Sequence, residues 1–238
     1  MISERIEQPT EPDAIPAELR RRSIMIVDDH PIVRQGLRRL IENEPDLIVC
    51  CEAESAAEAK ACLRRGIPDA MIVDVSLKHG DGLEVIRDAR AHHPAVRLLV
   101  LSMHDETIYA ERMLAAGANG YIMKQEASDQ FLVALRRVLD GNVYISEAVA
   151  SARVGRRGSR RVRSGGPIDS LTNRELQVLN MIGQGLSTRQ TADALHLSVK
   201  TVESHRQRIK RKLNLRTSSQ LMQYAVNWYA GRTPTPAA

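Results

Sequence analysis

The first 145 residues alternate between short apolar runs and longer segments with helical periodicity. Apolar runs of strand length lie at 24–27, 47–51, 70–73, 97–102 and 120–123. Apolar residues at helical spacing follow them, at 31–43, 55–66, 82–93, 105–117 and 128–141. Because parallel strands need crossover helices and are buried on both faces, this pattern predicts a doubly wound α/β sheet. Gly117 and Gly141 stand where left-handed caps would end two of the helices.

The chain after residue 169 shows helical patterns only. The first helix, predicted at 171–184, begins with Thr172 and has Glu175 three residues later, which is the sequence of a capping box. Further helices are predicted at 188–195, 198–213 and 218–229. A short helix, a tight turn and a longer helix are typical of the helix-turn-helix motif. The C-terminal part is therefore predicted to be a small all-α domain.

A segment without apolar periodicity separates the two patterns. Residues 151–169 contain six arginines together with glycines and serines, which is the composition of a solvated linker. The arginines fit either a plain spacer or an arm that follows phosphates. We divide the chain into an N-terminal tail (1–22), an α/β domain (23–145), a basic linker (146–168), an all-α domain (169–230) and a C-terminal tail (231–238).

Composition excludes several classes of protein. Of the 238 residues, 43% are hydrophobic, which is ample for a core. No apolar run approaches the ~18 residues of a membrane span, and the N-terminus lacks the apolar segment of a signal peptide. We therefore expect a cytoplasmic protein with no membrane partner. The cysteines, Cys50, Cys51 and Cys62, lie in or beside apolar runs and are interpreted as buried thiols.

The two parts of the chain differ in charge. Residues 1–145 carry 18 Lys and Arg against 24 Asp and Glu, a net charge of −6, whereas residues 146–238 carry 16 against 5, a net charge of +11. A strongly basic domain indicates nucleic-acid binding, and an acidic one is suited to hold a cation. Opposite charges attract at low salt, so we expect the N-terminal part to mask the basic part.

Polar residues stand where the predicted strands end. Asp28 and Asp29 follow the first strand, Asp74 follows the third, Ser102 ends the fourth and Lys124 follows the fifth. The carboxyl ends of parallel strands share one edge of the sheet, where ligands of open α/β folds bind. Bound Mg²⁺ would remove the repulsion between the adjacent aspartates. Asp74 is then a candidate nucleophile toward a phosphoryl group, whose oxygens Lys124 and Ser102 would contact.

A protein of another class would use the same carboxylates. A metal-dependent nuclease holds its ions with clustered acidic residues, and a DNA-binding domain would suit it. Lys124 at the fifth strand argues against this alternative, as does the lack of a further acidic pair on the rim to hold a second metal. We therefore expect a regulator and not an enzyme.

Several motifs resemble those of two-component response regulators of the NarL/FixJ family. They are VDDHPIVRQGL, VDVSLKHGDGLEVI, LSMHDE and GANGYIMK, followed by LTNRE, GLSTRQTADAL and LSVKTVESH. The resemblance extends from about Ser23 to Trp228. It implies a flavodoxin-like receiver domain of strand order 2-1-3-4-5 joined to a LuxR-type DNA-binding domain. It also implies phosphorylation-dependent control of transcription, with Asp74 phosphorylated by a partner histidine kinase.

The resemblance assigns roles around the metal. Asp29 would bind Mg²⁺ directly, Asp28 through water, and the backbone carbonyl of Ser76 would be a ligand beside Asp74. One departure lies nearby: Lys78 stands four residues after Asp74, where many receivers have proline. It adds a cation close to the site.

Two further residues match the switch pair of receivers. Ser102 matches the hydroxyl residue that moves toward the phosphoryl group. Tyr121, three residues before Lys124, matches the aromatic residue that then turns inward. Simple packing at a strand end is the alternative role of Tyr121.

The helix at 198–213 resembles a recognition helix that lies in the major groove. The match to the family makes Glu203, Ser204 and Gln207 candidates for base edges, and Lys200, Thr201, His205, Arg206 and Arg208 candidates for phosphates. His205 fits a packed helix position equally well. The last helix is implied to make a homodimer contact on DNA, although its apolar stripe also fits a plain core. Thr191 departs from the isoleucine that the family commonly has there.

Overall fold

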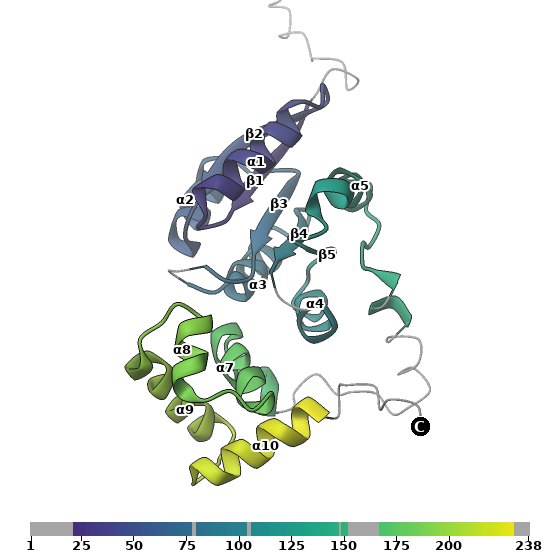
Figure 1. The fold of residues 1–238 in the computed structure, drawn as a ribbon. Coiled ribbons are helices and arrows are strands. Elements are labelled where there is room, and N and C mark those ends of the chain that lie inside the picture. Colours follow the sequence, from purple (N-terminus) through teal and green to yellow (C-terminus); the bar gives the residue numbers. More distant parts are fainter. Residues whose placement is uncertain (1–20, 78–79, 104–105, 148, 152–166, 231–238) are drawn as a thin grey trace, which may run out of the picture.

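The computed structural model describes residues 21–77, 80–103, 106–147, 149–151 and 167–230. Its N-terminal part has the predicted alternation of strands and helices (Figure 1). The elements are β1 (Arg22–Val27), α1 (Pro31–Glu42), β2 (Leu47–Ala53), α2 (Ala56–Arg65), β3 (Ala70–Asp74), α3 (Gly82–His92), β4 (Arg97–Ser102), α4 (Glu106–Ala115), β5 (Gly120–Met123) and α5 (Ala127–Leu139). Each predicted strand and helix is present, with shifts of a few residues at the ends.

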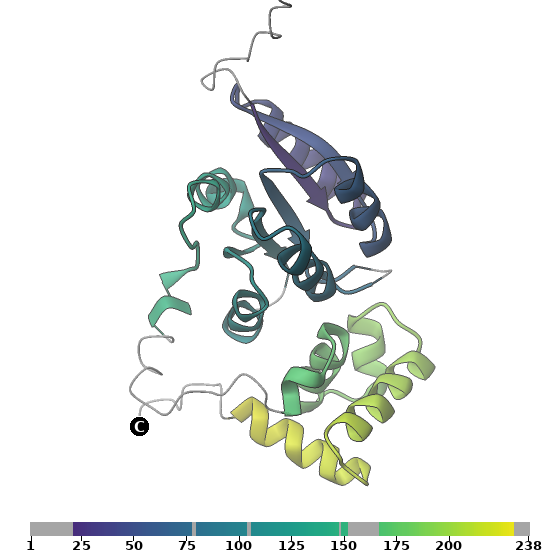
Figure 2. The same ribbon diagram turned by 180° about the vertical axis from the view of Figure 1, so that it is seen from behind.

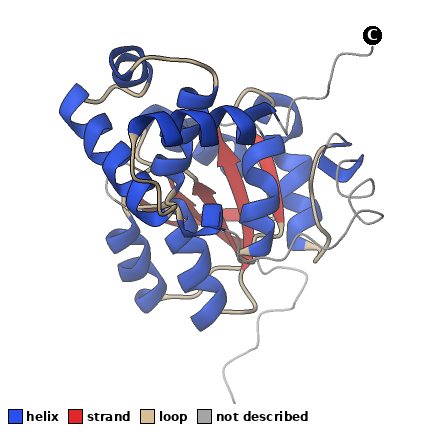
Figure 3. Cartoon of the chain, turned by 90° about the horizontal axis from the view of Figure 1, so that it is seen from below, coloured by secondary structure: helices blue, strands red, loops and turns tan. Residues whose placement is uncertain are grey.

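The strands form one parallel sheet in the order β2-β1-β3-β4-β5, as the resemblance implied. Successive side chains of a strand point to opposite faces, and β1 shows the consequence. Ile24 and Ile26 belong to the apolar cluster with α1 and α5, whereas Met25 and Val27 belong to the cluster with α2, α3 and α4. Helices cover both faces (Figure 3), which explains why the strands are apolar throughout and do not alternate.

The interpretation of the three cysteines as buried thiols is wrong. The register of β2 against β1 shifts between Ile24 and Met25, and Met25 pairs with Cys51, so that Cys50 is the extra residue of a β-bulge. Cys50 is exposed and is a free thiol. Cys51 forms a disulfide with Cys62 of α2. The apolar run predicts the strand but not the bulge. The bulge decides toward which face of the sheet each cysteine points.

Two glycines end helices as predicted. Gly117 follows α4 with a φ of 113°, and Gly141 follows α5 with a φ of 86°. These values lie in the left-handed region, which glycine adopts without the clash of a side chain. The chain can therefore turn back sharply toward β5 after α4.

The C-terminal part contains the short helix η2 (Pro167–Ser170), α7 (Asn173–Gly183), α8 (Thr188–Ala194), α9 (Val199–Lys212) and α10 (Ser218–Ala230). The predicted capping box of α7 is present, because Thr172 and Glu175 each accept a hydrogen bond from the backbone N–H of the other. A second box begins α8 at Ser187, and Ser198 caps α9 as predicted. The helix-turn-helix of α8 and α9 is confirmed.

The two parts pack against each other. One cluster of buried apolar side chains includes Tyr109 and Met113 of α4 together with Leu171 and Leu176 at the start of α7. Figures 1 and 2 show the C-terminal helices beyond the carboxyl ends of the strands, where the candidate site lies. Packing against this edge places α7 next to the predicted chemistry.

The segment between the parts is only partly described. Residues 147 and 149–151 are helical, and Val149 is buried, although the predicted linker began at 146. Residues 152–166, which include all six arginines of the predicted linker, lie outside the described residues. Within the described ranges, no helix combines the length and the apolar character needed to cross a bilayer.

Candidate functional site

Three carboxylates meet at the carboxyl edge of the sheet. Asp28 and Asp29 follow β1, and Asp74 ends β3, the strand beside it. The three residues are only 2%, 5% and 3% exposed. Burying like charges this close together is unfavourable unless cations compensate them. The prediction that these residues converge is confirmed, and the edge has an excess of negative charge.

Lys124 supplies one compensating cation from the end of β5. Its Nζ lies 2.7 Å from Asp28 Oδ2 and 2.8 Å from Asp74 Oδ2. Burial lowers the pKa of Lys124, but the charges of Asp74 and Asp28 outweigh burial and raise it overall. Burial raises the pKa of Asp74, and Asp28 adds to this effect while Lys124 opposes it. One ammonium group therefore does not neutralise the cluster.

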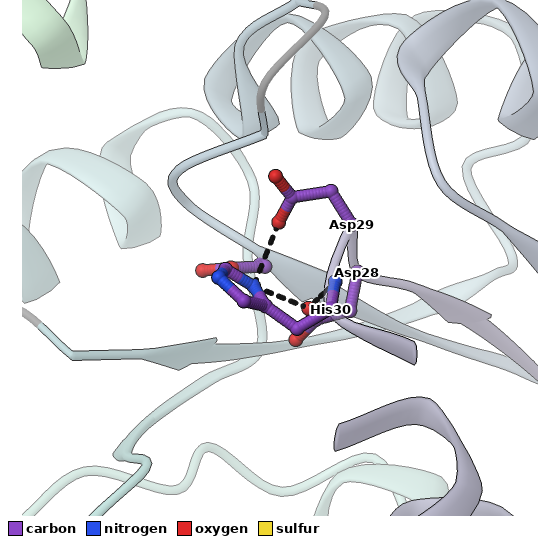
Figure 4. Close-up of side chains that lie close together, drawn as sticks. Asp28, Asp29 and His30 are labelled. Carbon is purple, nitrogen blue, oxygen red and sulfur yellow. Dashed lines mark hydrogen bonds and ion pairs between the residues drawn. The ribbon is translucent and has the colours of Figure 1, made fainter. Parts of the chain in front are cut away.

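His30 is a fourth member of the cluster that the sequence analysis missed (Figure 4). Its Nδ1 lies 2.8 Å from Asp29 Oδ1 and 3.1 Å from Asp28 Oδ1. One ligand atom from each of His30, Asp28, Asp29 and Asp74 lies within 4.8 Å of the others. Carboxylate oxygens suit a hard divalent cation such as Mg²⁺, so the residues fit this metal. The signal in the sequence was the position of His30 directly after the two aspartates.

The remaining predicted site residues lie beside this cluster. The backbone N–H of Ser76 donates to Asp74 Oδ1 at 3.2 Å, which holds one oxygen of the carboxylate. Ser102 is fully buried at the end of β4, and its backbone carbonyl accepts from the N–H of Lys124. Tyr121 of β5 is 1% exposed, so its ring already occupies an inward position.

The loop between β3 and α3 also contacts the C-terminal domain. Gln177 of α7 donates from Nε2 to Ser76 Oγ at 2.8 Å. Asn173 donates from its backbone N–H to Asp81 Oδ2 at 3.0 Å and from Nδ2 to Asp81 Oδ1 at 2.5 Å. Lys78 of this loop lies outside the described residues. No local sequence pattern indicates these contacts, because the partners are about a hundred residues apart.

Two arginines strengthen the same contact. Arg112 of α4 donates to the backbone carbonyl of Leu171, just before α7. Arg174 donates to Gln177 Oε1 at 2.7 Å and so holds the side chain that binds Ser76. Burial lowers the pKa of Arg174, while Tyr109 and Asp29 oppose the shift. The N-terminal half of α7 is therefore anchored to α4 and to the acidic edge.

The candidate DNA-binding residues lie along α9, and most face solvent. Lys200, Glu203, Ser204, Gln207 and Arg208 are exposed, while Thr201, His205 and Arg206 are half-buried. The apolar residues Val202 and Ile209 are fully buried and hold α9 to its own domain. In the described structure the receiver does not cover the face of α9 that is predicted to read bases. The N-terminal part therefore contacts the basic domain, as expected, but through α7 and not through this face.

Neighbouring side chains constrain some of these residues. Glu203 accepts a hydrogen bond from Thr188 Oγ1 at 3.0 Å and lies 3.6 Å from Arg206 Nε. Burial lowers the pKa of His205, and Arg208 lowers it further. A neutral imidazole is a weaker partner for phosphate than a cation, which favours the packing role of His205.

Comparisons with known proteins agree with this architecture. Residues 24–136 match the response regulator receiver domain, and residues 169–225 match bacterial regulatory proteins of the luxR family. The transcriptional regulatory protein DegU of Brevibacillus brevis is 32% identical over 211 residues, covering 83% of this chain and 89% of DegU. The oxygen regulatory protein NreC of Staphylococcus haemolyticus is 33% identical over 208 residues, covering 85% and 96%.

A solved structure gives the same result for the fold. The complex of the response regulator RcsB with DNA is similar over 87% of this chain and 98% of RcsB, with 26% identity and a TM-score of 0.52. Sequence, topology and the two matched domains lead to one conclusion. The chain belongs to the NarL/FixJ family of two-component response regulators, transcription regulators that join a receiver domain to a LuxR-type DNA-binding domain.

Proposed function

We propose that Asp74 accepts the phosphoryl group from a partner histidine kinase. The observation that carries the proposal is the position of Lys124 Nζ, which bridges Asp74 and Asp28 within the buried cluster. A carboxylate oxygen of Asp74 attacks phosphorus, and the group bound to phosphorus leaves with its electron pair. Lys124, whose raised pKa keeps it protonated, contacts the oxygens of the transferred group.

Asp28, Asp29, Asp74 and the backbone carbonyl of Ser76 are the residues that would hold Mg²⁺. When bound, Mg²⁺ supplies positive charge that offsets the carboxylates and the phosphoryl oxygens. The excess of carboxylates over ammonium groups at the edge supports this assignment. The pairing of Asp28 with Lys124 leaves Asp29 as the more suitable direct ligand.

Ser102 and Tyr121 are proposed as the residues that respond to phosphorylation. Ser102 ends β4, next to Lys124 across the strand pair, where its hydroxyl can reach a group on Asp74. Tyr121 is buried on β5, the strand beside β4. Its ring would change position when Ser102 moves. A change at Asp74 would shift the balance between pre-existing arrangements of this edge.

The C-terminal domain is proposed to place α9 in the major groove of DNA. Glu203, Ser204 and Gln207 would contact base edges, and Lys200, Thr201, His205, Arg206 and Arg208 would contact phosphates. The exposure of most of these residues supports the assignment.

Met222 and Val226, one turn apart on α10, are 40% and 43% exposed, which supports a homodimer contact through this helix. A protein with these partners acts where DNA is, which we propose to be the cytoplasm.

The contact of α7 with the receiver is proposed to couple the two domains. Gln177 and Asn173 bind Ser76 and Asp81 in the loop that follows Asp74. Phosphorylation changes the charge beside this loop, so it would weaken the contact and free the C-terminal domain to pair on DNA. The receiver then restrains α7, and not α9.

Phosphorylation chemistry tests the central assignment. The full-length protein is incubated with Mg²⁺ and acetyl phosphate, and its intact mass is measured. We expect the mass of one phosphoryl group to be gained by the parent and by Asp140→Asn, whose side chain is 61% exposed, but not by Asp74→Asn. Equal phosphorylation of Asp74→Asn would overturn the assignment. Cleavage of plasmid DNA in the same buffer would favour the nuclease alternative.

The coupling has its own test. Gln177→Ala removes the hydrogen bond to Ser76, so the unphosphorylated variant should bind DNA several-fold more tightly than the parent. The matched control is Gln184→Ala, at the exposed end of the same helix. If both variants bind DNA like the parent, the contact of α7 does not restrain the domain.

A further inference from the structure

Cys51 and Cys62 connect two layers of the receiver. Cys51 lies in β2, the edge strand of the sheet, and Cys62 lies in α2, the helix that covers it. The two residues form a disulfide with a Cα–Cα distance of 6.3 Å, which is within the range of such bonds. Cys62 is 4% exposed, whereas Cys51 is half-buried. The pair is therefore open to a small reagent through Cys51 only.

Arg65 lies beside both sulfur atoms. Its Nη2 is 3.4 Å from Cys62 Sγ and 3.8 Å from Cys51 Sγ. A guanidinium group at this distance stabilises a thiolate, which is the form that reacts in thiol–disulfide exchange. The last turn of α2 therefore places a cation where the reduced pair would need one.

Cys50 provides an internal contrast. It is next to Cys51 in the sequence, but the bulge turns it away, and its thiol lies 3.4 Å from the backbone carbonyl of Ile24. Among the described contacts of Cys50 there is no guanidinium, and partial burial of its thiol raises its pKa. Cys50 is therefore suited to remain a thiol when the other two react.

A permanent disulfide would be unusual in a protein that must act where DNA is. The thiol pools of such compartments are reducing, and disulfides found there are mostly transient or redox-sensing. We propose that Cys51 and Cys62 are a modification site, a dithiol that is reversibly oxidised to a disulfide by low-molecular-weight disulfides. Nothing in the phosphorylation chemistry or the DNA contacts uses these residues.

The exchange takes place in two steps. The thiolate of Cys51 attacks one sulfur of the small disulfide, which forms a mixed disulfide and releases one thiolate. The thiolate of Cys62 then attacks the sulfur of Cys51, which forms the internal bond and releases the second thiolate. Two protein thiols are oxidised and one small disulfide is reduced to two thiolates, which take up the two protons that the protein thiols released. A small dithiol or an excess of thiol reverses the sequence.

Alkylation and mass measurement test the proposal on the full-length protein. Cys50→Ser serves as the background, so that only the pair reacts. After equilibration with glutathione disulfide and unfolding in N-ethylmaleimide, we expect no maleimide and no glutathione on the protein. After prior reduction with a phosphine, we expect two maleimides. Two maleimides after the oxidising step, or glutathione that stays on Cys51, would overturn the proposal.

Arg65 is tested as a positioning residue through the pH dependence of the reaction. In the Cys50→Ser background, Arg65→Gln should slow bridge formation several-fold near neutral pH and shift its pH profile upward. Arg65→Lys, which keeps the charge, should restore most of the rate. The same profile for all three proteins would show that Arg65 does not activate the pair.

A second readout does not depend on trapping chemistry. The disulfide closes a short loop, because its cysteines are 11 residues apart. Closing a loop restricts the unfolded chain, so the oxidised Cys50→Ser protein should unfold at a temperature several degrees above that of the reduced protein. Equal unfolding temperatures would contradict a bond between these two layers.

Discussion

The acidic edge of the receiver and the exposed face of α9 are organised in opposite ways. At the edge, Asp28, Asp29 and Asp74 are buried, and Lys124 pairs with Asp28 and Asp74. On α9, most candidate DNA contacts face solvent. Among these described residues, only Glu203 forms a hydrogen bond with another helix, which Thr188 of α8 donates. The first site is assembled by folding, whereas the second is completed by its partner.

This difference has an energetic meaning. Buried like charges destabilise the folded receiver unless a cation binds. Binding of Mg²⁺ at this edge should therefore raise the stability of the folded state. Exposed side chains on α9 cost the fold little, and they bring charge to DNA phosphates mainly when DNA is bound. Substitutions at the edge should therefore change stability and chemistry together, whereas those on α9 should change binding alone.

Lys124→Met should have the largest effect on stability. Removing the ammonium group leaves Asp28 and Asp74 without their shared cation, and breaking a buried pair in this way costs about 3 kcal/mol. Mg²⁺ should restore much of the loss. Thermal unfolding with and without Mg²⁺ measures this, with Lys60→Met, a substitution of a half-exposed side chain on α2, as the control. A variant as stable as the parent in the absence of Mg²⁺ would contradict this view of the edge.

Glu175→Gln should have the next largest effect, in the C-terminal domain. Burial raises the pKa of Glu175, but the hydrogen bonds from Lys212 and Thr172 outweigh burial and lower it overall. A carboxyl group with a lowered folded pKa stabilises the fold above its unfolded pKa, and this stability is lost as the pH falls through the folded pKa. The substitution should therefore cost about 2 kcal/mol at pH 7 and much less at acidic pH.

The fluorescence of Trp228, the single tryptophan of the chain, reports unfolding of this domain. Glu203→Gln on the exposed face of α9 is the control and should change the free energy of unfolding by less than about 0.5 kcal/mol. A loss for Glu175→Gln that is the same at both pH values would show that ionisation of Glu175 does not stabilise the domain.

Asp29→Ala should weaken Mg²⁺ binding by about 10-fold, equivalent to about 1.4 kcal/mol. Asp28→Ala should weaken it less, because Asp28 is already paired with Lys124. Water-proton relaxation with Mn²⁺ as the probe, followed by displacement with Mg²⁺, measures binding without relying on phosphorylation. Equal binding curves for Asp29→Ala and the parent would exclude Asp29 as a ligand.

Thr191→Val should have the smallest effect and the opposite sign. Thr191 is 1% exposed, and its Oγ1 has no hydrogen-bond partner among the described residues. Replacing a buried, unsatisfied hydroxyl by a methyl group of similar size should raise the free energy of unfolding by about 1 kcal/mol. Chemical unfolding followed by tryptophan fluorescence checks this, and a loss of stability would mean that the hydroxyl has a partner.

The sequence predicted the receiver edge well because topology determines it. Once five parallel strands are placed, their carboxyl ends meet, and Asp74 and Lys124 must lie close together. The capping box at Thr172 and the N-cap at Ser198 likewise depend on residues three positions apart. Local spacing and strand order are the two kinds of information that a single sequence carries most directly.

The features that the sequence did not predict depend on contacts across the fold. The bulge at Cys50 is a one-residue irregularity of register, and it decides that Cys51 faces α2. The bonds from Asn173 and Gln177 to the receiver join segments about a hundred residues apart. The expected masking of the basic domain relied on net charge, which gives attraction between domains but not the surface through which they meet.

The most direct test of the central claim is the affinity for DNA of the full-length protein before and after phosphorylation. A DNA fragment selected from random sequences by the phosphorylated protein is titrated with parent and Asp74→Asn at one salt concentration, with and without acetyl phosphate. We expect acetyl phosphate to tighten binding by the parent at least about 10-fold, within the usual range of coupling between sites, and to leave Asp74→Asn unchanged. Equal affinity of the phosphorylated and unphosphorylated parent would contradict control of DNA binding through Asp74.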